Sequence, residues 1–389
     1  MRRLAGGLQN YAWGSHTLLA DLRGEEPSAQ PEAEIWYGAH PSTATLCNDG
    51  LSLLERVEGD PVGLLGQSVV DRFGPKLPFL LKLLAAGSPL SIQAHPSIEQ
   101  AKAGFAAEEA AGISRSDPQR SFKDDNHKPE LICALTPFEA LVGFRPIEQT
   151  LRFFDHIGFD ALNTVLSKHG PKVAVSQVLD TSESTSDDSV SNIVDQLVNA
   201  CTNASGSNWS AESALIVRLA NQYQGDPGVI VASLLNYTTL QPGQALYLGA
   251  GNLHAYVSGL AVEVMANSDN VLRGGLTPKY IDVPNLLDVV LPDTVTPTLV
   301  EIDSDGRYLT PAPEFELRRL ALAESPVVAG PSIILCTEGT VVVTQGAETV
   351  ELGPTEAVWL AADESGQVSG TGERAWHATV GPPTTLIGG

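Results

Sequence analysis

The sequence predicts a mainly β protein in which an all-helical segment interrupts the strands and a second β domain follows. Three observations predict this class. Short extended segments separated by turns fill the first third, and apolar residues recur at three- and four-residue spacing over about 146–237. From Gln241 on, short Val-, Thr- and Leu-rich segments alternate with Gly and Pro, as in a β-sandwich or barrel. The 389 residues are enough for two or three domains.

Composition narrows the possible functions. The net charge of −23 disfavours binding to nucleic acid or to an anionic lipid surface. No apolar run approaches the ~18 residues of a membrane span, and no signal-peptide core follows the two arginines at the start, so we expect a cytoplasmic protein. The four cysteines are far apart and form no CxxC motif, which is typical of buried thiols rather than a disulfide framework.

The first third is expected to contain strands and one longer helix. Residues 76–96 combine an apolar run, a Gly-Ser-Pro turn and the strand-like LSIQAH. Residues 97–112 are rich in Ala and Glu and lack proline, which predicts a helix. LICAL and FEALVGF then predict two strands, and the Thr136–Pro137 step between them indicates a hairpin.

Five segments with helical periodicity follow, and we expect an all-helical insertion at 146–237. The polar run TSESTSDDS at 181–189 is interpreted as a loop between two of its helices. The strands on either side would form one domain in two parts, 1–145 and 238–310. Residues 311–389 would form a separate C-terminal β domain.

A weak internal repeat links the two β regions. The spacing of Gly243, Gly249, Gly251 and His254 resembles the second motif of the cupin barrel, with Gly249 where proline is usual. A shift of 110 residues, from 254 to 364, aligns GPTEAVWLA and places Glu364 at the histidine position. The resemblance implies a C-terminal cupin-like barrel that lacks the metal ligand.

Gln93 and His95 form the clearest candidate pair of metal ligands. They lie two apart on a strand-like segment, so both side chains would point to one face. Glu130, in HKPE, and His254, in GAGNLHAY, are further candidates, and two nitrogens with two oxygens suit zinc. Spacing alone does not join residues this far apart, and each histidine is also compatible with an ordinary packed or surface residue.

A family resemblance joins the four residues. The chain resembles the type I mannose-6-phosphate isomerases along nearly its whole length, through motifs in the family's order: NYAWGS at 10–15, AEIWYGAHP at 33–41, LPFLLKLLAAGSPLSIQAHP at 77–96, DDNHKPEL at 124–131, FEALVGFRP at 138–146, GNLHAYVSG at 251–259 and NSDNVLRGGLTPK at 267–279. The helical insertion and the C-terminal domain carry no such motif.

The resemblance implies that Gln93, His95, Glu130 and His254 hold one zinc ion per chain, in a fold of two cupin-type barrels with an inserted helical domain. It also implies the interconversion of mannose 6-phosphate and fructose 6-phosphate by proton transfer through an enediol(ate). Such an enzyme would serve mannose, GDP-mannose and fructose metabolism.

The reaction requires a cation for the phosphate and an acid–base group. Arg273, in LRGGLTPK, is a candidate cation for an oxyanion or a phosphate and matches the family's catalytic arginine, while Lys279 and Ser91 are candidate phosphate contacts. Lys128 and Glu263 lead the acid–base candidates, although Lys128 could merely screen carboxylates and Glu263 could pair with Arg273. Further expected substrate contacts are His127, Tyr256 and Asp269. Residues Trp13, Trp36 and His40 are assigned to core packing.

Two other functions stay open at this point. A different metal-dependent cupin enzyme, such as an iron oxygenase, would need two histidines and a carboxylate. A non-catalytic sugar-phosphate-binding cupin would need no Lewis acid. The Gln93 ligand and the Arg273–Lys279 pair argue for the isomerase. No heptad pattern indicates a coiled coil, so a monomer is the simplest expectation.

Overall fold

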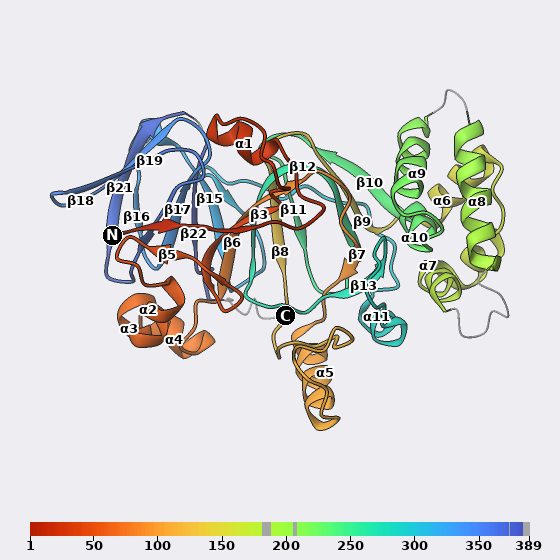
Figure 1. Ribbon diagram of the computed structural model, residues 1–389, viewed down its shortest axis with the longest axis horizontal. Helices are drawn as coiled ribbons and strands as arrows, with labels where there is room; N and C mark the ends of the chain where they lie inside the picture. The colour runs from red at the N-terminus through yellow and green to blue at the C-terminus, as the bar shows by residue number, and fades with distance from the viewer. Residues whose placement is uncertain (181–187, 205–207, 373, 384–389) are drawn as a thin grey trace.

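The computed structural model describes residues 1–180, 188–204, 208–372 and 374–383. Strands from both ends of the chain form one end of the molecule, a large sheet occupies the middle, and helices α6–α10 lie at the other end (Figure 1). The expected mainly β architecture with a helical insertion is therefore confirmed. In the described part of the chain, no helix is long and apolar enough to cross a membrane.

The central sheet has eleven strands and carries the candidate site. Its main path runs through β10 (Leu235–Leu240), β9 (Phe138–Phe144), β12 (His254–Ala266), β6 (Phe79–Ala86), β3 (Glu34–His40) and β2 (Gly7–Gln9). The remaining strands pair beside this path: β4 (Thr43–Ala44), β7 (Ile92–Ala94), β8 (Glu130–Ala134), β11 (Ala245–Leu248) and β13 (Leu272–Gly275).

Strand β12 connects most of these strands. Its first half pairs with β9 and β7, and its second half pairs with β6 and β8. Because β8 and β9 are both antiparallel to β12, they run in the same direction. The expected hairpin across Thr136–Pro137 is therefore wrong, although both of its strands are present. The polar turn instead passes the chain from one half of β12 to the other.

A bend in β12 reverses which side chains face the interior. The register shifts between Tyr256 and Ser258, and Gly259 adopts a positive φ of 117°. Before the bend Ala255 and Val257 pack against the helical end, whereas after it Leu260, Val262 and Val264 pack in the core beside the C-terminal strands. Tyr256 and Glu263 consequently line the same cavity, which uninterrupted alternation would forbid.

The chain's first strand belongs to a different sheet. β1 (Arg2–Ala5) and β5 (Leu46–Cys47) complete a seven-stranded sheet with β14 (Arg307–Tyr308), β15 (Glu316–Leu320), β17 (Ser332–Cys336), β20 (Ala357–Leu360) and β22 (Ala375–Thr379). A four-stranded sheet packs with it and contains β16 (Val327–Ala329), β18 (Thr340–Gln345), β19 (Glu348–Leu352) and β21 (Ser365–Thr371). The sequence gives no sign of this pairing, because β1 is only four residues long.

The helical segments lie where periodicity predicts them. They are α6 (Ile147–Ile157), α7 (Asn163–Leu179), α8 (Asp188–Asn203), α9 (Ser210–Gln222) and α10 (Gly228–Ser233). Helix α7 is kinked at Gly170, ahead of Pro171. The helices share one apolar core with β7, β9 and β12. Most of the expected 181–189 loop lies outside the described residues, and its last two residues begin α8.

Shorter helices border the sheets. They are α1 (Leu18–Arg23), α2 (Leu53–Gly59), α3 (Pro61–Leu65), α4 (Gln67–Phe73), α5 (Ile98–Ala110), α11 (Val283–Val289) and the 3₁₀ turn η1 (Leu322–Glu324). Helix α5 is the one expected at 97–112. Ser97 caps it by accepting from the Gln100 N–H, while the Gln100 side chain accepts from the Ser97 N–H.

Replacing Gly259 tests the bend in β12. An added Cβ would lie 2.6 Å from the Pro137 carbonyl oxygen, on a backbone conformation that L-residues avoid. We expect Gly259→Ala to lower the free energy of unfolding by about 2 kcal/mol or more. Gly59→Ala is the control, because its Cβ would meet nothing within 4 Å. Equal denaturant midpoints for the two variants would contradict this account of the bend.

His377 gives a pH test of the C-terminal sheet. Burial lowers its pKa from 6.5 to about 4, so the folded protein holds the ring neutral. The unfolded chain binds a proton below pH 6.5, and stability present above that pH is lost as pH falls toward 4. At pH 5 this residue alone should cost roughly 2 kcal/mol.

Chemical denaturation at pH 7 and pH 5 measures this loss. His377→Leu should remove that part of the pH dependence, whereas the exposed His156→Leu in α6 should retain it. An unchanged pH dependence in His377→Leu would refute the assignment.

Candidate metal centre and active site

Three buried side chains meet at the end of the central sheet. His95 follows β7, Glu130 begins β8 and His254 begins β12. Their exposed fractions are 1%, 3% and 1%, and one ligand atom from each lies within 4.8 Å of the other two. Nε2 of His95 lies 3.3 Å from one Glu130 oxygen, and Nε2 of His254 lies 3.4 Å from the other.

The hydrogen bonds of the two imidazoles orient them for a cation. Nδ1 of His95 lies 2.7 Å from the Asn270 carbonyl oxygen, and Nδ1 of His254 lies 3.0 Å from that of Asn252. Each ring therefore carries its proton on Nδ1 and turns a lone pair on Nε2 toward Glu130. Both Nε2 atoms are buried without a well-aligned hydrogen-bond donor. Orphaned nitrogens of this kind beside a carboxylate fit a metal ion.

Electrostatics support the same interpretation. Burial lowers the pKa of His95 to about 4, which keeps the imidazole neutral and able to ligate. Burial alone would raise the pKa of Glu130, but His95, Lys128 and His254 together hold it well below its usual value. The cluster therefore offers two imidazole nitrogens and one carboxylate. Within the described residues it is the one group of His, Cys, Asp and Glu side chains with metal-binding spacing.

Gln93 lies beside this cluster. On β7 it is the register partner of His254 in β12 and of Arg273 in β13. Register partners in adjacent strands point to the same face, so the Gln93 amide lies on the face that carries His254. It also lines the cavity described next.

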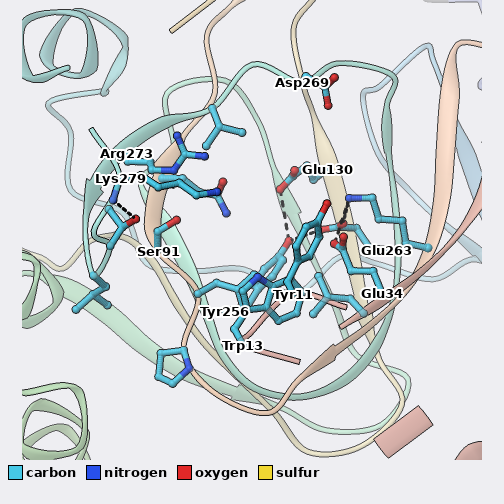
Figure 2. Close-up of a pocket in the computed structure, with 18 of the residues that line it drawn as sticks. Tyr11, Trp13, Glu34, Ser91, Glu130, Tyr256, Glu263, Asp269, Arg273 and Lys279 are labelled. Carbon is cyan, nitrogen blue, oxygen red and sulfur yellow. Dashed lines mark hydrogen bonds and ion pairs between the residues drawn. The ribbon is translucent and has the colours of Figure 1, made fainter. Parts of the chain in front are cut away.

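The cluster opens into a cavity of about 760 Å³ with oppositely charged ends. Figure 2 shows Arg273, Lys279 and Ser91 on one side and Glu34 and Glu263 across from them, with Glu130 between. In the described structure, Arg273 and Lys279 form no ion pair within 4.0 Å. Burial lowers the pKa of both side chains, and Arg273 and Lys123 lower that of Lys279 further. This end is suited to an anion.

A buried charge network forms the opposite wall. Lys82 Nζ lies 3.3 Å from Glu34 and 3.4 Å from Glu263, and the Tyr256 hydroxyl donates to Glu263 at 2.9 Å. Burial lowers the pKa of Lys82, but Glu34, Glu263 and Glu130 outweigh it and raise the pKa overall. Burial also raises the pKa of Glu263, which Lys82 opposes. Glu263 pairs with Lys82 and not with Arg273.

Lys82 and Glu34 were not among the sequence-derived candidates. Each lies in a wholly buried strand, within FLLKLLAA and EIWYGAH. A charge in such a strand is costly unless it is paired, and this was the signal that could have found them.

Lys128 and His127 point to different places. Lys128 Nζ lies 3.2 Å from Glu130 and lines the cavity. His127 does not line it, because its Nε2 lies 2.6 Å from Glu314 Oε1. In extended chain, Lys128 and Glu130 share one face and His127 faces away. Of this pair, the structure therefore places Lys128 in the cavity wall and His127 outside it.

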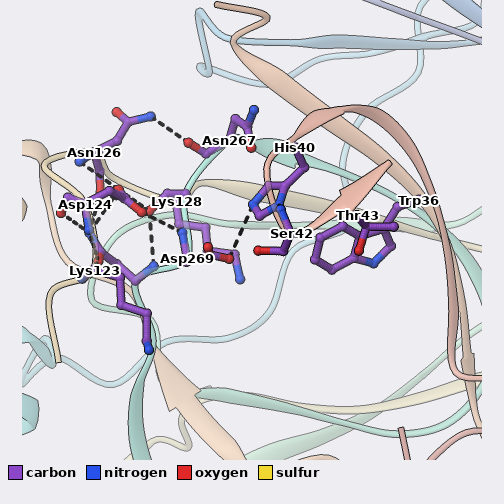
Figure 3. Close-up of polar contacts among 12 residues, drawn as sticks. Trp36, His40, Ser42, Thr43, Lys123, Asp124, Asn126, Lys128, Asn267 and Asp269 are labelled. Atoms are coloured by element: carbon purple, nitrogen blue, oxygen red, sulfur yellow. Dashed lines mark hydrogen bonds and ion pairs between the residues drawn. The ribbon is translucent and has the colours of Figure 1, made fainter. Parts of the chain in front are cut away.

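Asp269 lies at the rim, within a network around Asp124 (Figure 3). His40 Nε2 is 3.4 Å from Asp269 Oδ1, and His40 Nδ1 accepts from the Ser42 N–H. Asp124 accepts from the Asp269 N–H and the Ser268 hydroxyl. These contacts hold Asp269 in place, although its carboxylate remains partly exposed.

Three residues assigned to packing also line the cavity, namely Trp13, Trp36 and His40. Lys82 Nζ lies 4.8 Å from the centre of the Trp36 ring, over its face. Trp36 and His40 are buried, and both tryptophans pack against hydrophobic clusters, so these side chains pack in the core and form part of the cavity wall at the same time.

Comparison with known proteins gives one family. The domain family described as phosphomannose isomerase type I, catalytic domain, matches residues 1–147. The mannose-6-phosphate isomerase of Escherichia coli strain K12 is 38% identical, with 94% of this chain and 96% of that protein covered. The corresponding protein of Aspergillus fumigatus is 31% identical, with 95% and 94% covered.

Solved structures agree over the whole chain. A crystal structure of a mannose 6-phosphate isomerase bound with zinc and yttrium is 35% identical and superimposes with a TM-score of 0.87, covering 98% of this chain and all of that one. A zinc-bound holo structure gives a TM-score of 0.86. The chain is thus a member of the mannose-6-phosphate isomerase family, type I, and an isomerase.

Proposed function

We propose that this enzyme interconverts mannose 6-phosphate and fructose 6-phosphate, with one zinc ion held by Gln93, His95, Glu130 and His254. The proposal rests on one observation, namely what the cavity brings together. His95, Glu130 and His254 (the metal-type cluster) lie at a cavity that also has a cationic end, formed by Arg273 and Lys279, and buried acid–base groups. The zinc-bound relatives and the two orphaned Nε2 atoms support the metal. We place the helical insertion within the first of two cupin-type barrels, which is built from 1–145 and 238–310 and would hold the metal, and we place the second barrel at 311–389.

The cationic end would hold the substrate's phosphate. Arg273 offers a planar fork for two phosphate oxygens, Lys279 adds a point charge and Ser91 adds a hydroxyl. A phosphosugar anchored there would extend its C1–C2 end toward Glu130 and Lys128. Because Arg273 has no ion pair with any described residue, its charge is available to the ligand.

The opposite end would handle the proton. Lys128 and Glu263 remain the acid–base candidates, since both line the cavity and a base must move a proton between C1 and C2. Tyr256 would act by holding Glu263, because its hydroxyl lies 2.9 Å from that carboxylate and 3.5 Å from Glu130. Asp269, at the rim, would contact sugar hydroxyls. When bound, zinc would supply a Lewis acid for the sugar's oxygens.

Two alternatives are less well supported. A non-catalytic binding protein has no need for the buried Lys82–Glu263 network, which is costly to desolvate. An iron oxygenase would leave the cationic end without a role. The enzyme is expected to act as a cytoplasmic monomer on a small phosphorylated hexose.

Zinc content provides a direct test. The purified enzyme should hold one zinc per chain, lose activity on chelation and recover it when a divalent metal is restored. His254→Gln should hold far less zinc, whereas His156→Gln, exposed in α6, should hold a full equivalent. Stoichiometric iron with oxygen consumption would overturn the proposal.

Arg273→Ala separates a role toward substrate from a structural one. Turnover with mannose 6-phosphate, measured in a coupled assay, should fall roughly 10²–10³-fold, because a preorganised cation at the anion is lost. Zinc content should stay near one per chain. Arg152→Ala, an exposed change in α6, should leave both values unchanged. Parallel loss of zinc and turnover in Arg273→Ala would show that Arg273 only supports the fold.

A further inference from the structure

Asp226 connects the helical insertion to the cationic end of the cavity. It lies in the turn between α9 and α10, and its carboxylate accepts three backbone N–H groups. Oδ1 accepts from Gly228 at 2.7 Å and from Leu276 at 3.0 Å, and Oδ2 accepts from Thr277 at 3.0 Å. Two of these donors belong to the loop that follows β13.

That loop carries the substrate-facing cations. Arg273 lies on β13 immediately before it, and Lys279 lies two residues after Thr277. Lys279 is further tied to the loop, because its N–H donates to the Thr277 hydroxyl at 3.1 Å. A shift of Leu276 and Thr277 would therefore move Lys279 directly and would release the end of the strand that holds Arg273.

The loop has a backbone that needs support. Leu276 has a φ of 54°, a left-handed conformation that is unfavourable for a non-glycine residue. Charge-assisted hydrogen bonds from its own N–H and the next one to Asp226 offset that cost. The approach is also close, since a Cβ on Gly228 would lie 2.3 Å from the Leu276 nitrogen. Only glycine at position 228 leaves room for the loop to approach this closely.

The same part of the insertion contacts the other side of the cationic end. Gln222 and Tyr223 line the cavity, and the Tyr223 hydroxyl donates to the Pro89 carbonyl at 2.7 Å, two residues before Ser91. The C-terminal end of α9 and the Asp226 turn thus contact both loops that would surround the phosphate.

We propose that Asp226 is a positioning residue that sets the affinity for the phosphate group by holding the 276–279 loop, and that the helical insertion contributes to substrate specificity through it. The inference rests on the proposed function for the identity of the substrate. Asp226 acts mainly through Lys279, whose loop it holds, and does not itself line the cavity.

The sign of the effect distinguishes positioning from simple electrostatics. Asp226 is an anion near a site for an anion, so by Coulomb's law its removal should strengthen phosphate binding. If Asp226 instead positions the loop, its removal should weaken phosphate binding. Asp226→Asn is nearly isosteric, but its NH₂ group would face a backbone N–H donor. The hydrogen bonds that hold the 276–279 loop, here called the clamp, would therefore weaken.

We expect Asp226→Asn to raise the KM for mannose 6-phosphate about tenfold, with kcat and zinc content at their wild-type values. The Kd for inorganic phosphate, followed by the fluorescence of the cavity tryptophans, should rise by a similar factor. Asp195→Asn, an exposed change in α8, should alter neither constant. An unchanged or lower KM and Kd in Asp226→Asn would overturn the proposal.

Gly228→Ala tests the same loop while the charge of Asp226 stays in place. Its added methyl group should displace the loop and raise both constants in the same direction, with kcat and zinc content preserved. Wild-type constants for this variant would count against the clamp. A wild-type chain without isomerase activity would refute the proposed function instead, and the phosphate titration would still decide the role of Asp226.

Discussion

The bend in β12 is the constraint on which the site depends. One strand pairs with β6, β7, β8 and β9, and it carries His254, Tyr256 and Glu263. The register shift before Gly259 turns Tyr256 and Glu263 toward one cavity, while the residues between them pack into two different cores. A straight strand would place either the metal-type cluster or the acid–base wall outside the cavity.

Separation of charge organises the cavity. Lys82 neutralises much of the repulsion between Glu34 and Glu263, so the carboxylates can be buried close to Glu130. The cations at the far end have no such partners and are supported through the backbone of their loop. The two ends of the cavity therefore differ. The carboxylates at one end are paired with a lysine of the protein, whereas the cations at the other end would be paired with an anionic ligand.

The sequence predicted many of the strands, the helices of the insertion and the Gln93–His95 pair, because each has a local signal. Q-x-H on a strand, helical periodicity and the glycines before His254 depend on neighbours in the chain. Joining Glu130 and His254 to that pair required the family resemblance. The hairpin at Thr136–Pro137 failed because a turn residue shows where a strand ends and not which strand it pairs with.

Long-range contacts explain what else was missed. The pairing of β1 with β20 spans most of the chain, and Asp226 acts on a loop about fifty residues away in sequence. Lys82 was overlooked because its partners, Glu34 and Glu263, come from two other strands. The position of His127 also depends on a distant contact, because its imidazole lies against Glu314 from the C-terminal region and not in the cavity wall.

We expect one substrate molecule to span the two ends of this cavity. A crystal structure with zinc and fructose 6-phosphate, with anomalous data at the zinc edge, tests this expectation most directly. We expect a single zinc peak among His95, Glu130, His254 and Gln93. We also expect phosphate against Arg273 and Lys279, with C1 and C2 toward the metal. A zinc peak elsewhere, or a phosphate at the Glu263 end, would contradict this expectation.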